Sequence, residues 1–157
     1  MKKSKTKPGL LDVNVLIALI DPAHEFHAPA HLWFQRNRTH GWATCPITEN
    51  GCLRLLSKPG YPFPGLTVGR VRDILAGLVG AEGHRFWPDS VSLLQPKHPG
   101  PGLIDLSQTT PKHLTDLYLV SLAIAHRGRL VTFDRAIPVR AIAGFRPHHI
   151  EVLAAEP

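Results

Sequence analysis

Apolar residues recur in short blocks along the chain, and each block is followed by polar, proline or glycine residues. Continuous apolar runs of four or five residues are typical of buried parallel strands, and apolar positions three or four apart are typical of helices that face a core. This pattern predicts strands at 10–13, 41–45, 84–89, 130–133 and 149–153. It predicts helices at 14–20, 27–37, 47–56, 67–79 and 110–126. Because strands alternate with helices, we expect an α/β fold with a mainly parallel sheet covered on both faces.

The first 21 residues resemble a secretory signal peptide, since a basic stretch precedes an apolar run. Asp12 and Asn14 interrupt that run, however, and no clean cleavage site follows it. The run is also too short to span a membrane. We therefore expect residues 1–8 to be a disordered basic tail and residues 9–157 to form one domain without a membrane segment.

The two cysteines, Cys45 and Cys52, are too few for a disulfide framework and form no C-x-x-C pair, so a structural zinc site is not indicated. A reducing cytoplasm fits this composition. The chain has 18 basic and 12 acidic residues and a net charge of +6. That excess favours a polyanionic partner such as nucleic acid, although a generally basic surface explains it equally well.

Four acidic residues are predicted to meet at one edge of the sheet. Asp12 and Asp134 end two predicted strands, and Glu49 lies in the first turn of the helix that follows the second strand. Ligands of an open parallel sheet bind outside the carboxyl ends of its strands. Asp116 lies on a helix that is apolar on nearly every face, where an unpartnered carboxylate is costly unless it is protonated, hydrogen-bonded or close to a cation.

Each of these acids also has a simpler structural explanation. Asp12 could cap the following helix, Asp134 could be a turn residue, and Glu49 could be a favourable acid in a first helical turn. Asp116 is the hardest to explain in this way, because we place it in the second turn, where the effect of the helix dipole has faded.

Convergence of these carboxylates would require a compensating cation. Two like charges about 5 Å apart repel by roughly 3 kcal/mol at an effective dielectric constant near 20. Mg²⁺ or Mn²⁺ prefers carboxylate oxygens and water as ligands, and would remove this repulsion. Such ions also activate water and stabilise charge on a phosphate. An acidic metal site in a basic protein suits the hydrolysis of a nucleic-acid phosphodiester.

Four stretches in order resemble the PIN-domain family, specifically the VapC-type toxins of bacterial toxin–antitoxin pairs. They read "LLDVNVLIAL", "GWATCPITENGCLRLL", "HRFWPDSVSLL" and "LTDLYLVSLAIAHRGRLVTFDRA" and span most of residues 10–137. The resemblance implies a three-layer α/β/α sandwich, a ribonuclease that depends on Mg²⁺ or Mn²⁺, a homodimer and a cognate VapB antitoxin. It assigns the catalytic, metal-binding quartet to Asp12, Glu49, Asp116 and Asp134, with supporting polar residues at Asn14 and Thr115.

These assignments lead to a mechanism in which a metal-activated water hydrolyses RNA. Asp12, Asp116 and Asp134 would hold the ion directly or through water, and Glu49 would complete the shell or help to deprotonate the water. Three arginines flank the last catalytic strand and are candidates for contacts to RNA phosphates: Arg127, Arg129 and Arg135. The ten histidines show no zinc-ligand pattern, so we expect structural or surface roles for them.

Two other kinds of function compete with this one: that of a different α/β fold with an acid at its first strand, and that of a non-catalytic module. A phosphohydrolase of the haloacid dehalogenase type also begins with an Asp at a strand end but needs D-x-D, whereas this chain has Asp12-Val13-Asn14. A receiver domain would need paired acids near the first strand and a late lysine, which the sequence lacks. A non-catalytic PIN-like module that binds RNA remains the second alternative, although the presence of all four acids argues against it.

Overall fold

The computed structural model describes residues 6–94 and 100–154. In this part of the chain five strands form one sheet in the order β3-β2-β1-β4-β5, and every neighbouring pair is parallel. The strands are β1 (Gly9–Leu11), β2 (Trp42–Thr44), β3 (His84–Phe86), β4 (Arg129–Thr132) and β5 (Ile150–Val152). The predicted parallel sheet is therefore confirmed; β4 has its predicted length but begins one residue earlier, and the other four strands are one to three residues shorter than predicted.

The five predicted helices also form. They are α1 (Val13–Ile20), α2 (His27–Asn37), α3 (Pro46–Leu56), α4 (Val68–Val79) and α5 (Leu114–Ala125). The described residues also form five short 3-10 turns: η1 (Arg38–His40), η2 (Leu106–Gln108), η3 (Pro111–His113), η4 (Val139–Ala141) and η5 (Pro147–His149). None of the helices in the described ranges has the length and apolar character needed to cross a membrane.

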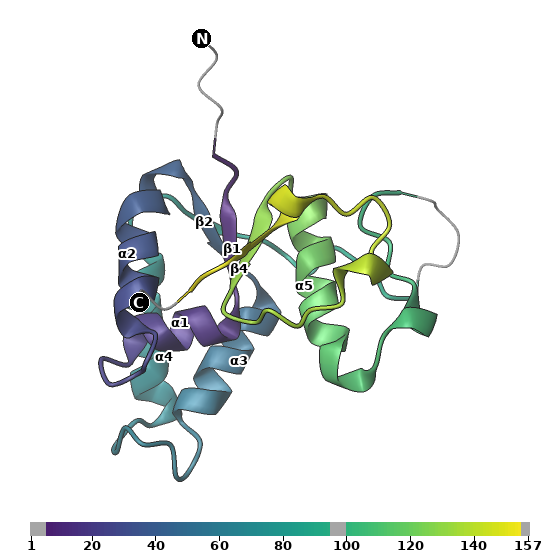
Figure 1. Ribbon diagram of the computed structural model, residues 1–157. Coiled ribbons are helices and arrows are strands. Elements are labelled where there is room, and N and C mark those ends of the chain that lie inside the picture. The colour runs from purple at the N-terminus through teal and green to yellow at the C-terminus, as the bar shows by residue number, and fades with distance from the viewer. Residues whose placement is uncertain (1–5, 95–99, 155–157) are drawn as a thin grey trace.

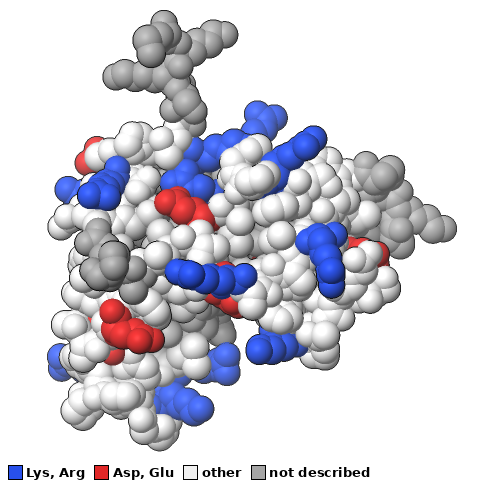
Figure 2. Space-filling model, viewed as in Figure 1, with Lys and Arg blue, Asp and Glu red and all other residues white. Residues whose placement is uncertain are grey.

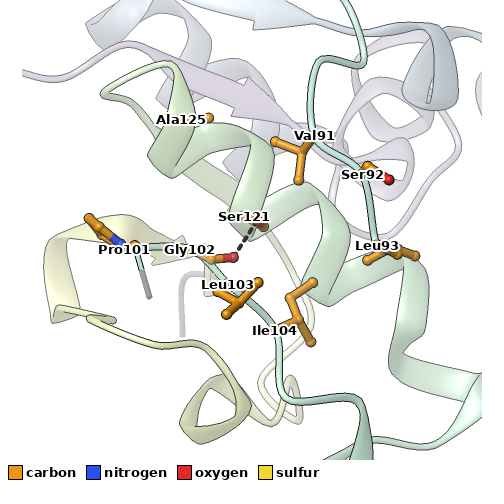
Figure 3. Close-up of a pocket in the computed structure, with 10 residues that line it drawn as sticks. Val91, Ser92, Leu93, Pro101, Gly102, Leu103, Ile104, Ser121 and Ala125 are labelled. Atoms are coloured by element: carbon orange, nitrogen blue, oxygen red, sulfur yellow. Dashed lines mark hydrogen bonds between the residues drawn. The ribbon is translucent and has the colours of Figure 1, made fainter. Parts of the chain in front are cut away.

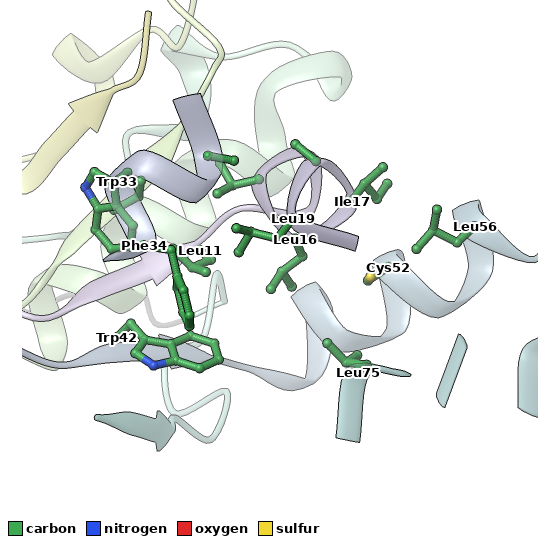
Figure 4. Packing of buried hydrophobic residues seen from close by; sticks show 14 of the residues in the cluster. Leu11, Leu16, Ile17, Leu19, Trp33, Phe34, Trp42, Cys52, Leu56 and Leu75 are labelled. Atoms are coloured by element: carbon green, nitrogen blue, oxygen red, sulfur yellow. The ribbon is translucent and has the colours of Figure 1, made fainter. Parts of the chain in front are cut away.

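The helices cover the two faces of the sheet and make three layers, as Figure 1 shows. Successive strand residues point to opposite faces, so Leu10 and Leu11 enter different cores. Leu11 packs with residues of α1 to α4 in the core drawn in Figure 4. Leu10 packs with α5 on the other side. Because both faces are buried at the centre of the sheet, β1 and the middle of β4 are apolar, whereas the edge strand β3 carries His84 and Arg85 and is largely exposed.

The boundary between β1 and α1 differs from the prediction by two residues. We predicted a strand over 10–13, but β1 ends at Leu11 and α1 begins at Val13. Asp12 is the single residue between them and is the N-cap of the helix. This short connection brings the start of α1 directly to the carboxyl end of the sheet.

The start of α5 differs from the prediction, and this changes the position of Asp116 in the helix. We predicted one helix over 110–126 and placed Asp116 in its second turn. In the structure, Pro111–His113 forms a separate 3-10 turn, and the α-helix begins at Leu114. Asp116 therefore lies in the first turn, where the partial positive charge of the helix N-terminus favours a carboxylate.

The predicted tail is only partly described, because residues 1–5 lie outside the described ranges. The carbonyls of Lys7 and Pro8 accept hydrogen bonds from Arg129, so the end of this segment is joined to the sheet. Cys45 and Cys52 are buried free thiols.

Candidate functional site

Asp12 is held at the carboxyl end of β1 by two hydrogen bonds. The backbone N–H of Val13 donates to its Oδ1 at 2.7 Å, and the hydroxyl of Thr132 donates to its Oδ2 at 2.6 Å. The residue is 6% exposed. The pKa of the Asp12 carboxyl is raised, chiefly because burial disfavours the charged form. The two hydrogen bonds lower it in part, and the charge of Asp134 raises it further. Asp12 is thus the N-cap of α1 and also lies at the sheet edge where the acids were predicted to meet.

Asp134 lies two residues beyond β4, at the same edge of the sheet. Its Oδ1 accepts a hydrogen bond of 2.7 Å from the backbone N–H of Ala136, as expected of a turn residue. Its own N–H donates to the Thr132 hydroxyl at 3.1 Å. Thr132 therefore bonds to both acids. The sequence analysis missed this threonine, although its position as the last residue of a buried strand before Asp134 is visible in the sequence.

Asp116 completes a group of three acids that interact through their charges. Burial raises the pKa of Asp116 to about 6, with further raising by the charges of Asp12 and Asp134 and a lowering by His113. The Asp116 side chain is 23% exposed, and its Oδ2 lies 3.9 Å from Nδ1 of His113. One ligand atom each from His113, Asp116 and Asp134 fall within 4.8 Å of one another, a spacing that could hold a metal ion.

Glu49 is placed differently from the three aspartates. It lies in the first turn of α3, as predicted, but its Oε1 accepts a hydrogen bond of 2.6 Å from the hydroxyl of Thr44. The Thr44 hydroxyl in turn lies 2.8 Å from Nε2 of His84. The Glu49 carboxylate is therefore directed to the ends of β2 and β3, and the structure does not bring it into the group of acids.

An open cleft of about 520 Å³ lies beside the acids. Its lining includes Asp12, Thr115 and Asp116 together with Asn50 and Arg54 of α3. Asp89, which follows β3, adds a carboxylate that the sequence analysis did not select. The argument used for Asp134, an acid shortly after a strand, would have found Asp89 as well.

Close packing of α3 on α1 positions the α3 residues that line this cleft. A Cβ added to Gly51 would lie 2.7 Å from Cγ2 of Val13, so any larger residue would push the helices apart. Gly51 lies between Asn50 and Arg54 in the sequence, and these two residues are four apart on one helix face. The missing side chain at Gly51 therefore lets α3 pack directly on the start of α1, next to Asp12.

The two predicted supporting residues also lie at this edge. Nδ2 of Asn14 is 3.5 Å from the Thr132 hydroxyl, while Oδ1 of Asn14 is buried and has no hydrogen-bond partner among the described residues. Nδ1 of His113 is a second buried atom of this kind. Buried polar atoms without partners beside a group of carboxylates fit a site that takes a cation and its water.

The three predicted RNA-contact arginines fall at opposite ends of the sheet. Arg135 is exposed and follows Asp134 directly. Arg129 opens β4, about 16 Å of extended chain from Asp134, and it binds Glu151 at 2.6 Å. Arg127 precedes it at the same amino edge. The placement of Arg127 and Arg129 does not favour a phosphate contact beside the acids. Figure 2 shows basic and acidic side chains interspersed on the face it displays, without a single basic stripe.

A second cavity, of about 160 Å³, lies between α5 and the segments 91–93 and 100–104. Figure 3 shows its mainly apolar lining and the hydrogen bond from the Ser121 hydroxyl to the carbonyl of Gly102. Among the residues that the structure describes, no ionisable side chain lines this cavity. The groups capable of acid–base or metal chemistry are instead at the edge with the three aspartates.

The histidines mostly have the structural roles that we expected. Nδ1 of His27 and Nε2 of His31 lie 2.7 and 3.0 Å from the carbonyls of Ala18 and Leu19, near the end of α1. His126 stacks on Trp87. His113 is the exception, because it belongs to the group of ligand atoms around Asp116.

Comparison with known proteins identifies the family of the chain. No family model matches the chain. Ribonuclease VapC44 of Mycobacterium tuberculosis is 43% identical over 146 residues, which cover 92% of this chain and 99% of the relative. Ribonuclease VapC39 of the same organism is 41% identical over 145 residues, with the same coverage, and Ribonuclease VapC38 is 40% identical over 129 residues. With this identity over nearly the whole length of both chains, the protein belongs to the VapC ribonuclease family.

Proposed function

We propose that this protein is an endoribonuclease, the toxin of a type II toxin–antitoxin pair, that hydrolyses RNA with the help of Mg²⁺ or Mn²⁺. The observation that carries the proposal is the electrostatic coupling of Asp12, Asp116 and Asp134 at one edge of the sheet, which contributes to the raised pKa of Asp116. Carboxylates in this arrangement are suitable ligands for a hard divalent cation. The relatives named as VapC ribonucleases support the same activity.

In this proposal, Asp12, Asp116 and Asp134 hold the ion directly or through water. The bound ion supplies a nucleophilic water at neutral pH and neutralises negative charge on the phosphate. The hydrogen bonds from Thr132 and Val13 fix the Asp12 carboxylate, so its oxygens are oriented before RNA binds. Thr115 and Asn14 offer polar groups at the same edge that can orient water.

Glu49 remains the fourth acid of the proposed mechanism, but we expect it to contribute less to cleavage than the three aspartates. To help deprotonate the attacking water, its carboxylate would have to leave the hydroxyl of Thr44. We therefore expect substitution of Glu49 to reduce cleavage less than substitution of Asp116.

RNA would approach the site along the cleft beside the acids. Arg54 lines this cleft, and no ion pair occupies its guanidinium in the described part of the chain. Arg135 is the second exposed cation near the acids. We propose that Arg54 and Arg135 contact RNA phosphates, because positive charge is needed to bring a polyanion to a carboxylate-rich cleft.

We also propose a cognate VapB-type antitoxin, a homodimer and a cytoplasmic location. These proposals rest on the family. Several large apolar side chains are exposed on the described surface, including Phe63, Val68, Ile74 and Phe86, and they supply apolar area of the kind used in protein interfaces.

The test is cleavage of RNA by the purified protein with Mg²⁺ or Mn²⁺, with and without a chelator. Wild type should cleave only when the metal is present, and Asp116→Asn should lose at least 100-fold in rate. Asp73→Asn is a matched control, because Asp73 is an exposed acid on α4 that pairs with Arg72 away from the cleft. Metal-independent RNA binding without cleavage under any condition would instead support the non-catalytic module.

A further inference from the structure

His113 has a position that the sequence motifs did not single out. It ends η3 and directly precedes α5, and its backbone N–H donates to the carbonyl of Thr110 at 3.0 Å. His113 and Asp116 are three residues apart at the beginning of this helix, so their side chains emerge on one face. The helix start therefore directs an imidazole and a carboxylate to the same place.

The imidazole nitrogen that faces Asp116 has no hydrogen-bond partner. Nδ1 of His113 is buried, and no donor or acceptor among the described residues bonds to it. Its distance of 3.9 Å from Oδ2 of Asp116 is too long for a hydrogen bond. A buried ring nitrogen is almost always bonded to something, so an additional group between His113 and Asp116 would explain this geometry.

The spacing of the surrounding atoms matches the ligand shell of one metal ion. Ligands at about 2.1 Å from an octahedral ion are about 3 Å apart when adjacent and about 4.2 Å apart when opposite. One ligand atom each from His113, Asp116 and Asp134 all lie within 4.8 Å of one another. Small movements of these side chains would bring the three atoms to a common ion.

We propose that His113 is a nitrogen ligand of the metal site, and that it makes this site prefer Mn²⁺ to Mg²⁺. This inference rests on the metal site of the proposed function and adds a ligand to it. Imidazole nitrogen suits transition metals, whereas Mg²⁺ favours carboxylate, carbonyl and water oxygens. A shell of one imidazole and two carboxylates therefore discriminates between these ions more strongly than carboxylates alone.

The direct test is pulsed electron paramagnetic resonance of the protein loaded with one equivalent of Mn²⁺. Wild type should show the nitrogen modulation of an imidazole bound to the ion, and His113→Gln should lose it. His40→Gln is the matched control, because His40 is exposed in η1, before the amino end of β2, and should leave the signal unchanged. A nitrogen signal that is absent from wild type, or persists in His113→Gln, overturns the proposal.

Calorimetric titration of the same proteins supplies a second measurement. His113→Gln should weaken Mn²⁺ binding by roughly tenfold or more and Mg²⁺ binding by much less. If His113 is only an ion-pair partner of Asp116, the affinities for both ions will change by the same factor. His113→Asn and circular dichroism of each variant separate loss of a ligand from loss of the fold.

These outcomes distinguish this inference from the proposed function. Mn²⁺ bound with a nitrogen signal, but without RNA cleavage, would support the ligand and contradict the nuclease. Cleavage with bound Mn²⁺ and no nitrogen signal would contradict the ligand alone. Failure of wild type to bind Mn²⁺ while it binds Mg²⁺ would contradict the ligand proposal alone, and failure to bind either ion would contradict both.

Discussion

The hydroxyl of Thr132 donates a hydrogen bond of 2.6 Å to Oδ2 of Asp12, and so joins the carboxyl ends of β4 and β1. The Thr132 hydroxyl oxygen also accepts a hydrogen bond of 3.1 Å from the backbone N–H of Asp134. One buried side chain thus fixes the relative position of two of the three aspartates.

Thr132→Val should separate the role of this hydroxyl from its packing, because valine has nearly the same shape. We expect the free energy of unfolding to fall by about 1–3 kcal/mol, since the carboxylate and the N–H lose a buried partner. Cleavage should fall at least tenfold, because Asp12 is no longer oriented. Urea denaturation and an RNA cleavage assay measure the two effects.

Thr44→Val is the control for that variant. Thr44 is the buried last residue of β2, and its hydroxyl bonds to Glu49 instead of an aspartate. A similar loss of stability with a much smaller loss of cleavage is expected. Equal losses of cleavage in both variants would show that Glu49 acts in catalysis as strongly as Asp12.

Asp116→Asn should stabilise the metal-free protein near neutral pH. The pKa of Asp116 is about 6 in the fold, above its ordinary value of 3.8, so the fold favours the protonated acid. The wild type therefore loses stability as the pH rises from about 4 to about 6, whereas asparagine cannot ionise. We expect a gain on the order of 2 kcal/mol at pH 7.5 and almost none at pH 4. Urea denaturation with a chelator at both pH values checks this, and a large loss of stability at pH 7.5 would contradict it.

Metal affinity should depend on pH for the same reason. A proton on Asp116 competes with the ion, so acidification through about pH 6 displaces the metal. For this one group, Mn²⁺ binding should weaken about tenfold between pH 7 and pH 5. Calorimetric titration across this range measures the change, and a flat profile would exclude Asp116 as a ligand.

Arg54→Gln should weaken RNA cleavage without changing metal binding. Arg54 lines the cleft, and a lost phosphate contact typically reduces affinity or rate by 10- to 100-fold, about 1.4–3 kcal/mol. Arg54→Lys should recover only part of this, because lysine lacks the planar guanidinium. Arg70→Gln is the control, an exposed arginine of α4 that does not line the cleft. Equal kinetics for Arg54→Gln and Arg70→Gln would remove Arg54 from the proposal.

The fold could be predicted from the sequence because its signals are local. Alternating blocks of apolar residues gave all five strands and all five helices, and the parallel order placed Asp12 and Asp134 at one edge. The start of α5 was missed because Thr110-Pro111 marks the beginning of helical backbone equally well for a 3-10 turn and for an α-helix.

The orientation of side chains could not be predicted in the same way. The position of Glu49 along α3 was correct, but its partner depends on the packing of α3 and on the hydroxyl of Thr44. Arg129 is close to Asp134 in sequence, and the length of the extended strand puts it at the other edge of the sheet. His113 carried no recognisable spacing, and only the three-dimensional position of its ring reveals it.

The cap formed by Asp12 has a consequence for deciding which related chains are active enzymes. Removal of Asp12 would deprive α1 of its N-cap and Thr132 of its acceptor, so selection for folding alone preserves this aspartate after activity is gone. The pKa values of both acids are raised, but Asp116 accepts no hydrogen bond among the described residues that would offset the cost of its ionised form. A descendant that no longer cleaves RNA gains stability by losing Asp116. In related chains, we therefore expect an intact Asp116 to be a better sign of a working nuclease than an intact Asp12.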